Sequence, residues 1–374
     1  MKEIVIPLGF DAPGSTTVLR AYRFGEAQAN AFRVYIQAAL HADEIPGLLV
    51  ADHLRRQLER LEGEGRIRGE ITLVPVANPI GAGQFILGQH HGRFELASGE
   101  NFNRRFVPFA KEVAQSLRSG GTQTPRDVAQ LRQAVSLALT SFQAESQLES
   151  LRIALMRLSA AADVVLDLHC DGEAVLHMYA NEKQVPDAVE LCRHLGVECL
   201  LHSGEQGGAS FEDNLVCQWM QLYEELGVPT DALPLFAVTL ELRGKKDVTD
   251  ECASRDAGNL IDYLMSRKVI SADAGLNAQK PMAMPEIRPF AGIEMLRAPT
   301  TGVLLYLQEV GTHVKSGDTV AVLVDPVSGV RHELKSTIDG YFFARDSERY
   351  VRAGHQVSFI AGHEPLGRVV TLTP

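Results

Sequence analysis

Two short stretches of the sequence carry residue types that bind metal ions in enzymes. His41 and Glu44 lie three residues apart in LHADEIPG (40–47), and His169 lies near the end of the apolar run DVVLDLHC (163–170). Two histidines and one carboxylate, with a fourth position open to water, are a standard ligand set of hydrolytic Zn²⁺. A His-x-x-Glu pair is common by chance, so the interpretation depends on further residues downstream. We predict one Zn²⁺ per chain at these three ligands.

Two acidic residues follow apolar runs in a way that fits the same site. Asp167 precedes His169 by two residues, so on an extended strand both side chains point to the same face and the carboxylate could orient the imidazole. Glu241 ends the buried run LFAVTLE (235–241), where a carboxylate is costly unless it has a task. Beside a metal-activated water, Glu241 would act as the general base and then protonate the leaving nitrogen.

A loop rich in Gly, His, Arg and Asn supplies candidate substrate contacts. It spans residues 85–109 and contains Arg93, Asn103 and Arg104. A guanidinium group binds a carboxylate through two parallel hydrogen bonds. The loop therefore suits a substrate that has an acidic end.

The segments between these residues alternate between strand and helix patterns. Continuous apolar runs predict strands at 3–8, 32–40, 69–78, 163–170, 174–180 and 235–244. Apolar residues at helical spacing predict helices at 46–62, 185–196, 214–227 and 250–270, and one long or two shorter helices at 126–162. Such alternation is typical of an α/β protein whose mixed, mostly parallel sheet is flanked by helices. Ligands of such sheets bind at the carboxyl ends of strands, where His41 and His169 are expected.

Length, composition and charge restrict the class of protein. A chain of 374 residues with 45% hydrophobic and 22% charged residues indicates a soluble globular protein of about two domains. No apolar run reaches the roughly 20 residues that span a bilayer, and a net charge of −11 argues against nucleic acid or an anionic membrane as a partner. Five cysteines without paired spacing suit a reducing compartment, so we predict a cytoplasmic protein. The sequence leaves a homo-oligomer open.

The last part of the chain has a different pattern. A proline-containing stretch near 281–289 predicts a linker or a crossing segment. From Gly292 onward short apolar runs are separated by glycines without any helical pattern, which predicts an all-β domain. We therefore divide the chain into a catalytic domain at 1–285 and a smaller β domain at 290–374.

The ordered set of motifs resembles that of the zinc carboxypeptidase superfamily, and within it the succinylglutamate desuccinylase/aspartoacylase branch. HADEIPG (41–47) stands where that branch typically has HGxExPG, with Ala42 in place of the glycine. It is followed by Asn103-Arg104, by DLH (167–169) and by TLELR (239–243). The helical segment 107–160 looks like an insertion relative to this branch.

The resemblance implies roles for individual residues. It implies a zinc ion held by His41, Glu44 and His169, with Glu241 as the catalytic carboxylate. It further implies that Asn103 and Arg104 contact a substrate carboxylate, and that Arg93 corresponds to an arginine that polarises the scissile carbonyl.

The segment 297–361 resembles a biotinyl/lipoyl-type barrel-sandwich domain. Carrier versions present a lysine at a hairpin tip, whereas the tip here, DPVSG (325–329), has none. The resemblance therefore implies a structural module, not a carrier.

These observations together predict a zinc-dependent hydrolase that cleaves the amide bond of an N-acylated amino acid or a related small molecule. Two alternatives stay open. One is a zinc carboxypeptidase that acts on peptides, which an open groove would favour over a closed pocket. The other is a non-catalytic binding or assembly protein with a vestigial zinc site, against which the retention of Glu241 argues.

Overall fold

The computed structural model describes residues 1–26, 31–119, 127–204, 210–272 and 282–367. Contacts between residues group the chain into two compact units. The first unit takes its residues from 1–169, 205–239 and 250–280, and the second from 170–204, 240–249 and 281–374. All three predicted metal ligands belong to the first unit.

The first unit contains a mixed sheet with the strand order β1-β2-β4-β3-β7-β11. The strands are β1 (Lys2–Pro7), β2 (Val18–Phe24), β3 (Arg33–Ala38), β4 (Glu70–Val74), β7 (Val164–Asp171) and the first half of β11 (Phe236–Gly244). β3 runs parallel to both β4 and β7, whereas β2 runs antiparallel to β1 and β4. In the β3–β7 register Gln37 lies opposite Asp167 and Ala38 opposite Leu168, so β3 ends beside the residue that precedes His169.

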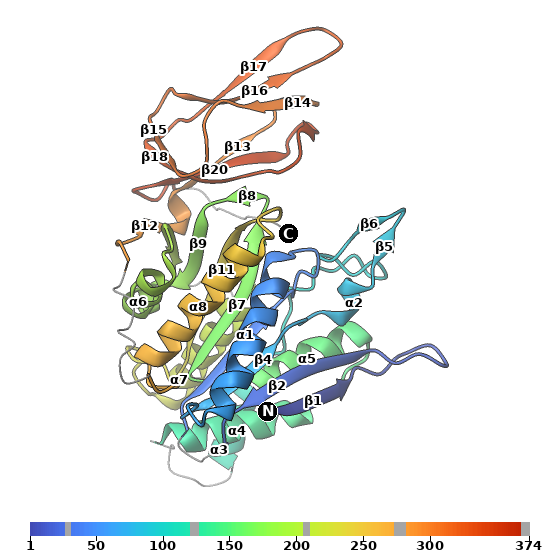
Figure 1. Ribbon diagram of the computed structural model, residues 1–374, viewed down its shortest axis with the longest axis vertical. Helices are drawn as coiled ribbons and strands as arrows, with labels where there is room; N and C mark the ends of the chain where they lie inside the picture. The colour runs from blue at the N-terminus through green and yellow to red at the C-terminus, as the bar shows by residue number, and fades with distance from the viewer. Residues whose placement is uncertain (27–30, 120–126, 205–209, 273–281, 368–374) are drawn as a thin grey trace. The chain divides into compact units, whose positions relative to one another are not determined.

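Helices flank this sheet (Figure 1). α1 (Pro46–Gly63) starts directly after the predicted ligand loop, has a proline in its first turn and packs against α8 (Asp250–Ser266). Gly47 allows its close approach to the sheet, because a Cβ there would lie 3.2 Å from the Cβ of Ala38 and 3.3 Å from the carbonyl of Leu168. The chief apolar core joins the sheet to four other helices: α3 (Ala110–Ser119), α4 (Val128–Ser141), α5 (Gln147–Ser159) and α7 (Phe211–Leu226).

The second unit contains the order β11-β9-β10-β12 and two antiparallel sheets. β9 (Leu176–Asn181), β10 (Cys199–Ser203) and β12 (Glu286–Pro289) are parallel, with α6 (Val185–Leu195) between β9 and β10. One antiparallel sheet has the order β13-β20-β18-β15, with β8 (Glu173–Ala174) paired to β18, and the other has the order β17-β16-β14-β19. Their strands are β13 (Ile293–Arg297), β14 (Gly302–Tyr306), β15 (Thr312–Val314), β16 (Thr319–Val324), β17 (Arg331–Lys335), β18 (Gly340–Arg345), β19 (Tyr350–Val351) and β20 (Gln356–Gly362).

The predicted fold class is confirmed: a mixed, mostly parallel sheet flanked by helices is joined in the sequence to C-terminal antiparallel sheets. The helical stretch 126–162 forms two helices, α4 and α5. The strands β2 and β10 were not predicted from the sequence. The predicted linker includes the strand β12, and its residue 281 lies outside the described residues. The division at 285–290 stays a prediction about separate domains.

Two further findings concern the predicted environment of the protein. None of the helices in the described ranges is long and apolar enough to cross a membrane. All five cysteines have free thiols.

Candidate metal centre

The first two predicted ligands lie in a tight loop between β3 and α1. Ala39, just after β3, has a positive φ of 59°, a conformation that costs an alanine roughly 1 kcal/mol and turns the chain sharply out of the sheet. The loop then closes on itself, because the Glu44 amide donates a hydrogen bond to the His41 carbonyl at 3.0 Å. Ala42 is not among the described residues with positive φ, so alanine fits here in place of the motif's glycine.

A second loop holds the ligand loop in position. The buried Asn78 side chain donates a hydrogen bond to the Leu40 carbonyl at 3.0 Å, and the Ala42 amide donates one to the Gly92 carbonyl, also at 3.0 Å. The same Asn78 accepts a hydrogen bond from the Gly81 amide at 2.8 Å, at the start of the short helix α2 (Pro79–Ala82). The loop that bears Arg93 is thereby fixed to the loop that bears His41.

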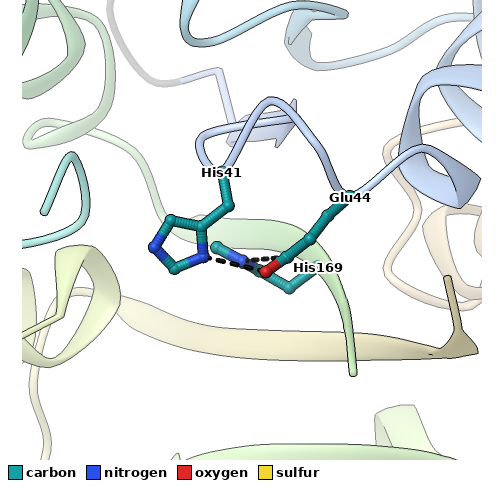
Figure 2. A group of neighbouring side chains, drawn as sticks. All are labelled: His41, Glu44 and His169. Atoms are coloured by element: carbon teal, nitrogen blue, oxygen red, sulfur yellow. Dashed lines mark hydrogen bonds and ion pairs between the residues drawn. The ribbon is translucent and has the colours of Figure 1, made fainter. Parts of the chain in front are cut away.

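The three predicted ligands converge on one point (Figure 2). Glu44 lies between the two rings: its Oε1 is 2.9 Å from His41 Nδ1, and its Oε2 is 2.7 Å from His169 Nδ1. One ligand atom from each residue lies within 4.8 Å of the others. All three side chains are buried, with exposed fractions of 4% or less.

The outward nitrogen of each imidazole has its own partner. His41 Nε2 is 2.9 Å from Asn101 Oδ1, and His169 Nε2 is 3.0 Å from Asp167 Oδ2. The Asp167 carboxylate also accepts a hydrogen bond from Gln37 Nε2 at 2.9 Å. With Nε2 of His41 held by Asn101 and the His169 ring beside the Asp167 carboxylate, each ring turns its Nδ1 toward Glu44 at the common point.

The electrostatics of the centre favour a positive charge within it. Burial alone would raise the pKa of Glu44, but the two imidazoles outweigh it and hold the pKa well below its ordinary value. Burial alone would lower the pKa of His169, but Asp167 and Glu44 outweigh it and hold the pKa well above its ordinary value. Burial and the charge of Arg93 lower the pKa of His41.

The ligand set fits a divalent cation. At neutral pH these directions leave Glu44 ionised and His41 neutral, which are the forms that bind metal. The two carboxylates that stabilise a proton on His169 would equally balance the charge of a metal ion. The combination of two imidazoles and one carboxylate is one of the ligand sets that catalytic zinc uses.

The predicted substrate contacts lie in the same unit as the ligands. Arg93 Nη2 donates to Glu44 Oε1 at 2.9 Å, which places this guanidinium directly at the centre. Asn103 is buried, and its Oδ1 accepts a hydrogen bond from the Phe211 amide at the start of α7, at 2.7 Å. Arg104 Nη1 donates to the Asn103 carbonyl at 2.7 Å. Burial lowers the pKa of Arg104. The positive charge of Arg93 lowers it further, whereas the negative charge of Glu212 raises it, so the two arginines interact electrostatically.

Glu241 lies in the second half of β11 and is partly buried. That half belongs to the second unit, whereas the three ligands belong to the first. Its role as the general base therefore stays a prediction.

Comparison with known proteins identifies the family of this chain. The sequence model of the succinylglutamate desuccinylase/aspartoacylase catalytic domain matches residues 30–263. The chain belongs to this family. Its members form a class of deacylases, so membership supports an enzyme. A search of curated proteins finds no match.

Solved structures of the succinylglutamate desuccinylase/aspartoacylase family share the fold. A family protein from Shewanella amazonensis has a TM-score of 0.82 at 24% identity, over 96% of this chain and 98% of its own. One from Shewanella frigidimarina has a TM-score of 0.82 at 23% identity, over 96% and 97%. One from Rhodobacter sphaeroides has a TM-score of 0.65 at 15% identity, over 97% and 96%. At these identities the likeness concerns the fold.

Two residues that contact the ligands or Asp167, Gln37 and Asn101, were not predicted from the sequence. Gln37 connects Asp167 to Tyr35, whose hydroxyl donates to Gln37 Oε1 at 2.7 Å, and both Gln37 and Tyr35 are fully buried. A glutamine inside the apolar run FRVYIQAAL was a signal that could have been used. Asn101 had no such signal, because its contact with His41 joins residues 60 positions apart.

Replacing Asn101 by leucine is expected to weaken zinc binding by about 10–100-fold, because His41 Nε2 loses the acceptor that fixes its tautomer. The Asn101→Asp variant keeps an acceptor oxygen in that place and should bind zinc as the wild type does. Competition with a chelator of known zinc affinity measures both. Equal affinities for the leucine variant and the wild type would show that Asn101 does not position His41.

Replacing Gly92 by alanine is expected to impair the centre without touching a ligand. The new Cβ would lie 2.1 Å from the Asp43 amide nitrogen and 2.6 Å from the Ala42 carbonyl carbon, so the loops must move apart. Displacing a positioned ligand loop by about 1 Å should lower kcat/KM by about 100-fold.

The matched control is Gly83→Ala in the same loop, where the new Cβ would come no closer than 3.5 Å to its neighbours. The control should have the kcat/KM and the zinc affinity of the wild type, as measured by steady-state kinetics and zinc titration. A Gly92→Ala variant that behaves like the control would refute the close packing of the two loops.

Proposed function

We propose that this chain is a zinc-dependent hydrolase that cleaves the amide bond of an N-acylated amino acid or a related small molecule. The observation that carries the proposal is the buried convergence of His41, Glu44 and His169, whose ligand atoms lie within 4.8 Å of one another. Family membership supports the deacylase class. The chain is expected to hold one zinc ion.

The proposed division of labour follows from the chemistry of each residue. Bound zinc would act as a Lewis acid and lower the pKa of a water molecule. Glu241 accepts a proton from the water that attacks the acyl carbon, and then delivers it to the nitrogen as the carbon–nitrogen bond breaks. Arg93 donates hydrogen bonds to the carbonyl oxygen as it gains negative charge.

The substrate is proposed to be held by its carboxylate. Arg104 supplies the positive charge and a two-pronged donor, and its Nη1 bond to the Asn103 carbonyl fixes the guanidinium plane. Asn103 uses its oxygen to bind the Phe211 amide, which orients its NH₂ group as a further donor. This arrangement suits a substrate with a carboxylate, and we propose an anionic small molecule as the partner of the site.

The second candidate is a carboxypeptidase, because a terminal carboxylate would satisfy the same arginine. A screen of N-acyl amino acids and short peptides against the zinc-loaded chain separates the two functions. The proposal predicts hydrolysis of N-acyl amino acids with a kcat/KM on the order of 10⁴ M⁻¹s⁻¹ and little release of C-terminal residues from peptides. Preferred cleavage of peptides would establish the carboxypeptidase, and a fully zinc-loaded chain without any hydrolysis would establish a non-catalytic protein.

A further inference from the structure

Glu173 connects the C-terminal antiparallel sheets to the segment that directly follows His169 in the chain. It lies in β8, which pairs with β18 so that Arg345 is opposite Glu173 (Figure 1). Its Oε2 accepts a hydrogen bond from Arg345 Nε at 2.6 Å, and its Oε1 accepts one from Arg349 Nη2, also at 2.6 Å. Burial alone would raise the pKa of Glu173, but the hydrogen bonds and charges of the two arginines outweigh it and lower the pKa. The carboxylate is therefore ionised at neutral pH and bonded to two guanidinium groups.

The two arginines are themselves fixed by several contacts. Both guanidinium groups lie over the ring of Tyr306 in β14, at 4.7 and 4.8 Å from its centroid. Arg345 Nη1 also donates to the Gln308 carbonyl at 2.9 Å, and Arg349 Nη1 donates to the Asp346 carbonyl at 2.7 Å. The Arg345 side chain is only 12% exposed, so its ion pair with Glu173 is less screened by solvent than a surface pair.

The turn after β11 packs on the backbone of residues 171–173. The Lys245 amide donates hydrogen bonds to the Asp171 carbonyl at 2.9 Å and to the Gly172 carbonyl at 3.1 Å. A Cβ on Gly244 would lie 2.8 Å from the Gly172 carbonyl oxygen, so the two backbones are in direct contact. The end of β11 is therefore held by the segment 171–173.

The same segment also packs on the end of β18. A Cβ on Gly172 would lie 2.7 Å from the Arg345 carbonyl oxygen and 2.9 Å from the Ser347 amide nitrogen. The Val175 amide donates a hydrogen bond to the Phe343 carbonyl at 2.9 Å. Displacement of the segment from β18 would therefore also displace it from the turn after β11.

The backbone between Glu241 and this turn is strained. Arg243 has a φ of 65°, a left-handed conformation that is costly for a residue with a side chain. Such a conformation persists only where the surrounding structure holds it in place. Because Arg243 lies two residues after Glu241, its relaxation would redirect the end of the strand that bears this carboxylate.

We propose that Glu173 is a positioning residue for the general base. Held by Arg345 and Arg349, it fixes the segment 171–173, which in turn fixes the end of β11 and so the Glu241 carboxylate. The role of the C-terminal antiparallel sheets in catalysis is then to hold the base in place. This inference rests on the proposed deacylase function and adds no chemical step to it.

The first test follows the backbone and needs no substrate. In the Glu173→Gln variant the amides of residues 241–247 should exchange with deuterium about 10-fold faster than in the wild type, because charge-assisted hydrogen bonds are lost. The control is Glu333→Gln, which removes a carboxylate from an exposed ion pair with Lys335 on β17 and should leave this exchange unchanged. Wild-type exchange of residues 241–247 in Glu173→Gln would overturn the proposal.

The second test measures kcat on a substrate that the screen has identified. Glu173→Gln should lower kcat by about 10–100-fold, as expected for a displaced catalytic group, with KM and zinc content at the wild-type values. The double variant Glu173→Gln/Glu241→Gln should be no slower than Glu241→Gln alone, because Glu173 acts through Glu241. A merely structural role would lower kcat by the same factor in both backgrounds, and that result would refute the proposal.

Arg349→Gln is a milder variant for the case that Glu173→Gln does not fold. It removes one of the two ion pairs and keeps the other, so it should show both effects at smaller size, and the lack of either would count against the proposal. If no substrate is hydrolysed, the proposed function fails, whereas the exchange experiment still decides whether Glu173 holds the end of β11. The failure of the deacylase function and the failure of this inference are therefore separate results.

Discussion

Replacing Glu241 by glutamine is expected to reduce kcat by about 10³-fold or more, with bound zinc still at about one per chain, because general base catalysis contributes on the order of 10²–10⁴. The amide is nearly isosteric with the carboxylate but cannot accept the proton of the attacking water. KM should change little, since Arg104 and Asn103 bind the substrate and remain in place.

The Glu241→Gln experiment needs a control for the loss of one negative charge. Glu251→Gln serves, because Glu251 is exposed in the first turn of α8. It should leave kcat, KM and zinc content at the wild-type values. A Glu241→Gln variant that keeps more than a tenth of the wild-type kcat would contradict the assignment of Glu241 as the base, and a variant without zinc would place Glu241 among the ligands.

Replacing Glu44 or His169 by alanine is expected to abolish both zinc binding and hydrolysis. Glu44 contacts both other ligands, at 2.9 and 2.7 Å. Its loss removes one zinc ligand and the negative charge that balances the zinc ion. Loss of His169 removes a donor and leaves the buried Asp167 carboxylate without its imidazole partner. A catalytic zinc site needs all three protein ligands.

Thermal unfolding gives a readout of this prediction that does not depend on activity. A bound molecule at 100 times its dissociation constant stabilises the folded state by about 2.7 kcal/mol. Added zinc should therefore raise the midpoint temperature of thermal unfolding of the metal-free wild type. The Glu44→Ala and His169→Ala variants should show no such rise. His53→Ala, in α1 and remote in sequence from the three ligands, removes an imidazole that pairs with Asp250; it is the control and should respond as the wild type does. A full response in either ligand variant would mean that the site is misassigned.

The sequence predicted the parts of the fold that depend on local patterns. Continuous apolar runs predicted β3, β7 and β11, because buried strands leave few alternatives for such runs. The strand β2, VLRAYRF, was missed because its polar residues interrupt the run, and β10 because it is short. The linker prediction at 281–289 rested on prolines, yet β12 forms there, since pairing with β10 outweighs the local signal.

The candidate site was predictable where its residues lie at the end of a strand or just after it. His41, Glu44 and His169 do so, and the structure brings their side chains together. The partners that orient them come from elsewhere in the chain. Asn101 reaches His41 from the second loop, which is tied in turn to α5 by a hydrogen bond from Arg152 Nη2 to the Asn101 carbonyl at 3.1 Å. No spacing in the sequence encodes such long-range contacts, which only folding produces.

The proposed function depends most directly on the link between one zinc ion and hydrolysis. The decisive measurement adds zinc stepwise to the chelator-treated chain and follows both bound metal and the rate on an N-acyl amino acid that the screen has identified. We predict that the rate rises in proportion to bound zinc and stops rising at about one ion per chain, as expected for a single three-ligand site. A rate that is unchanged by removal of the metal, or zinc that binds without restoring hydrolysis, would contradict the proposed zinc-dependent function.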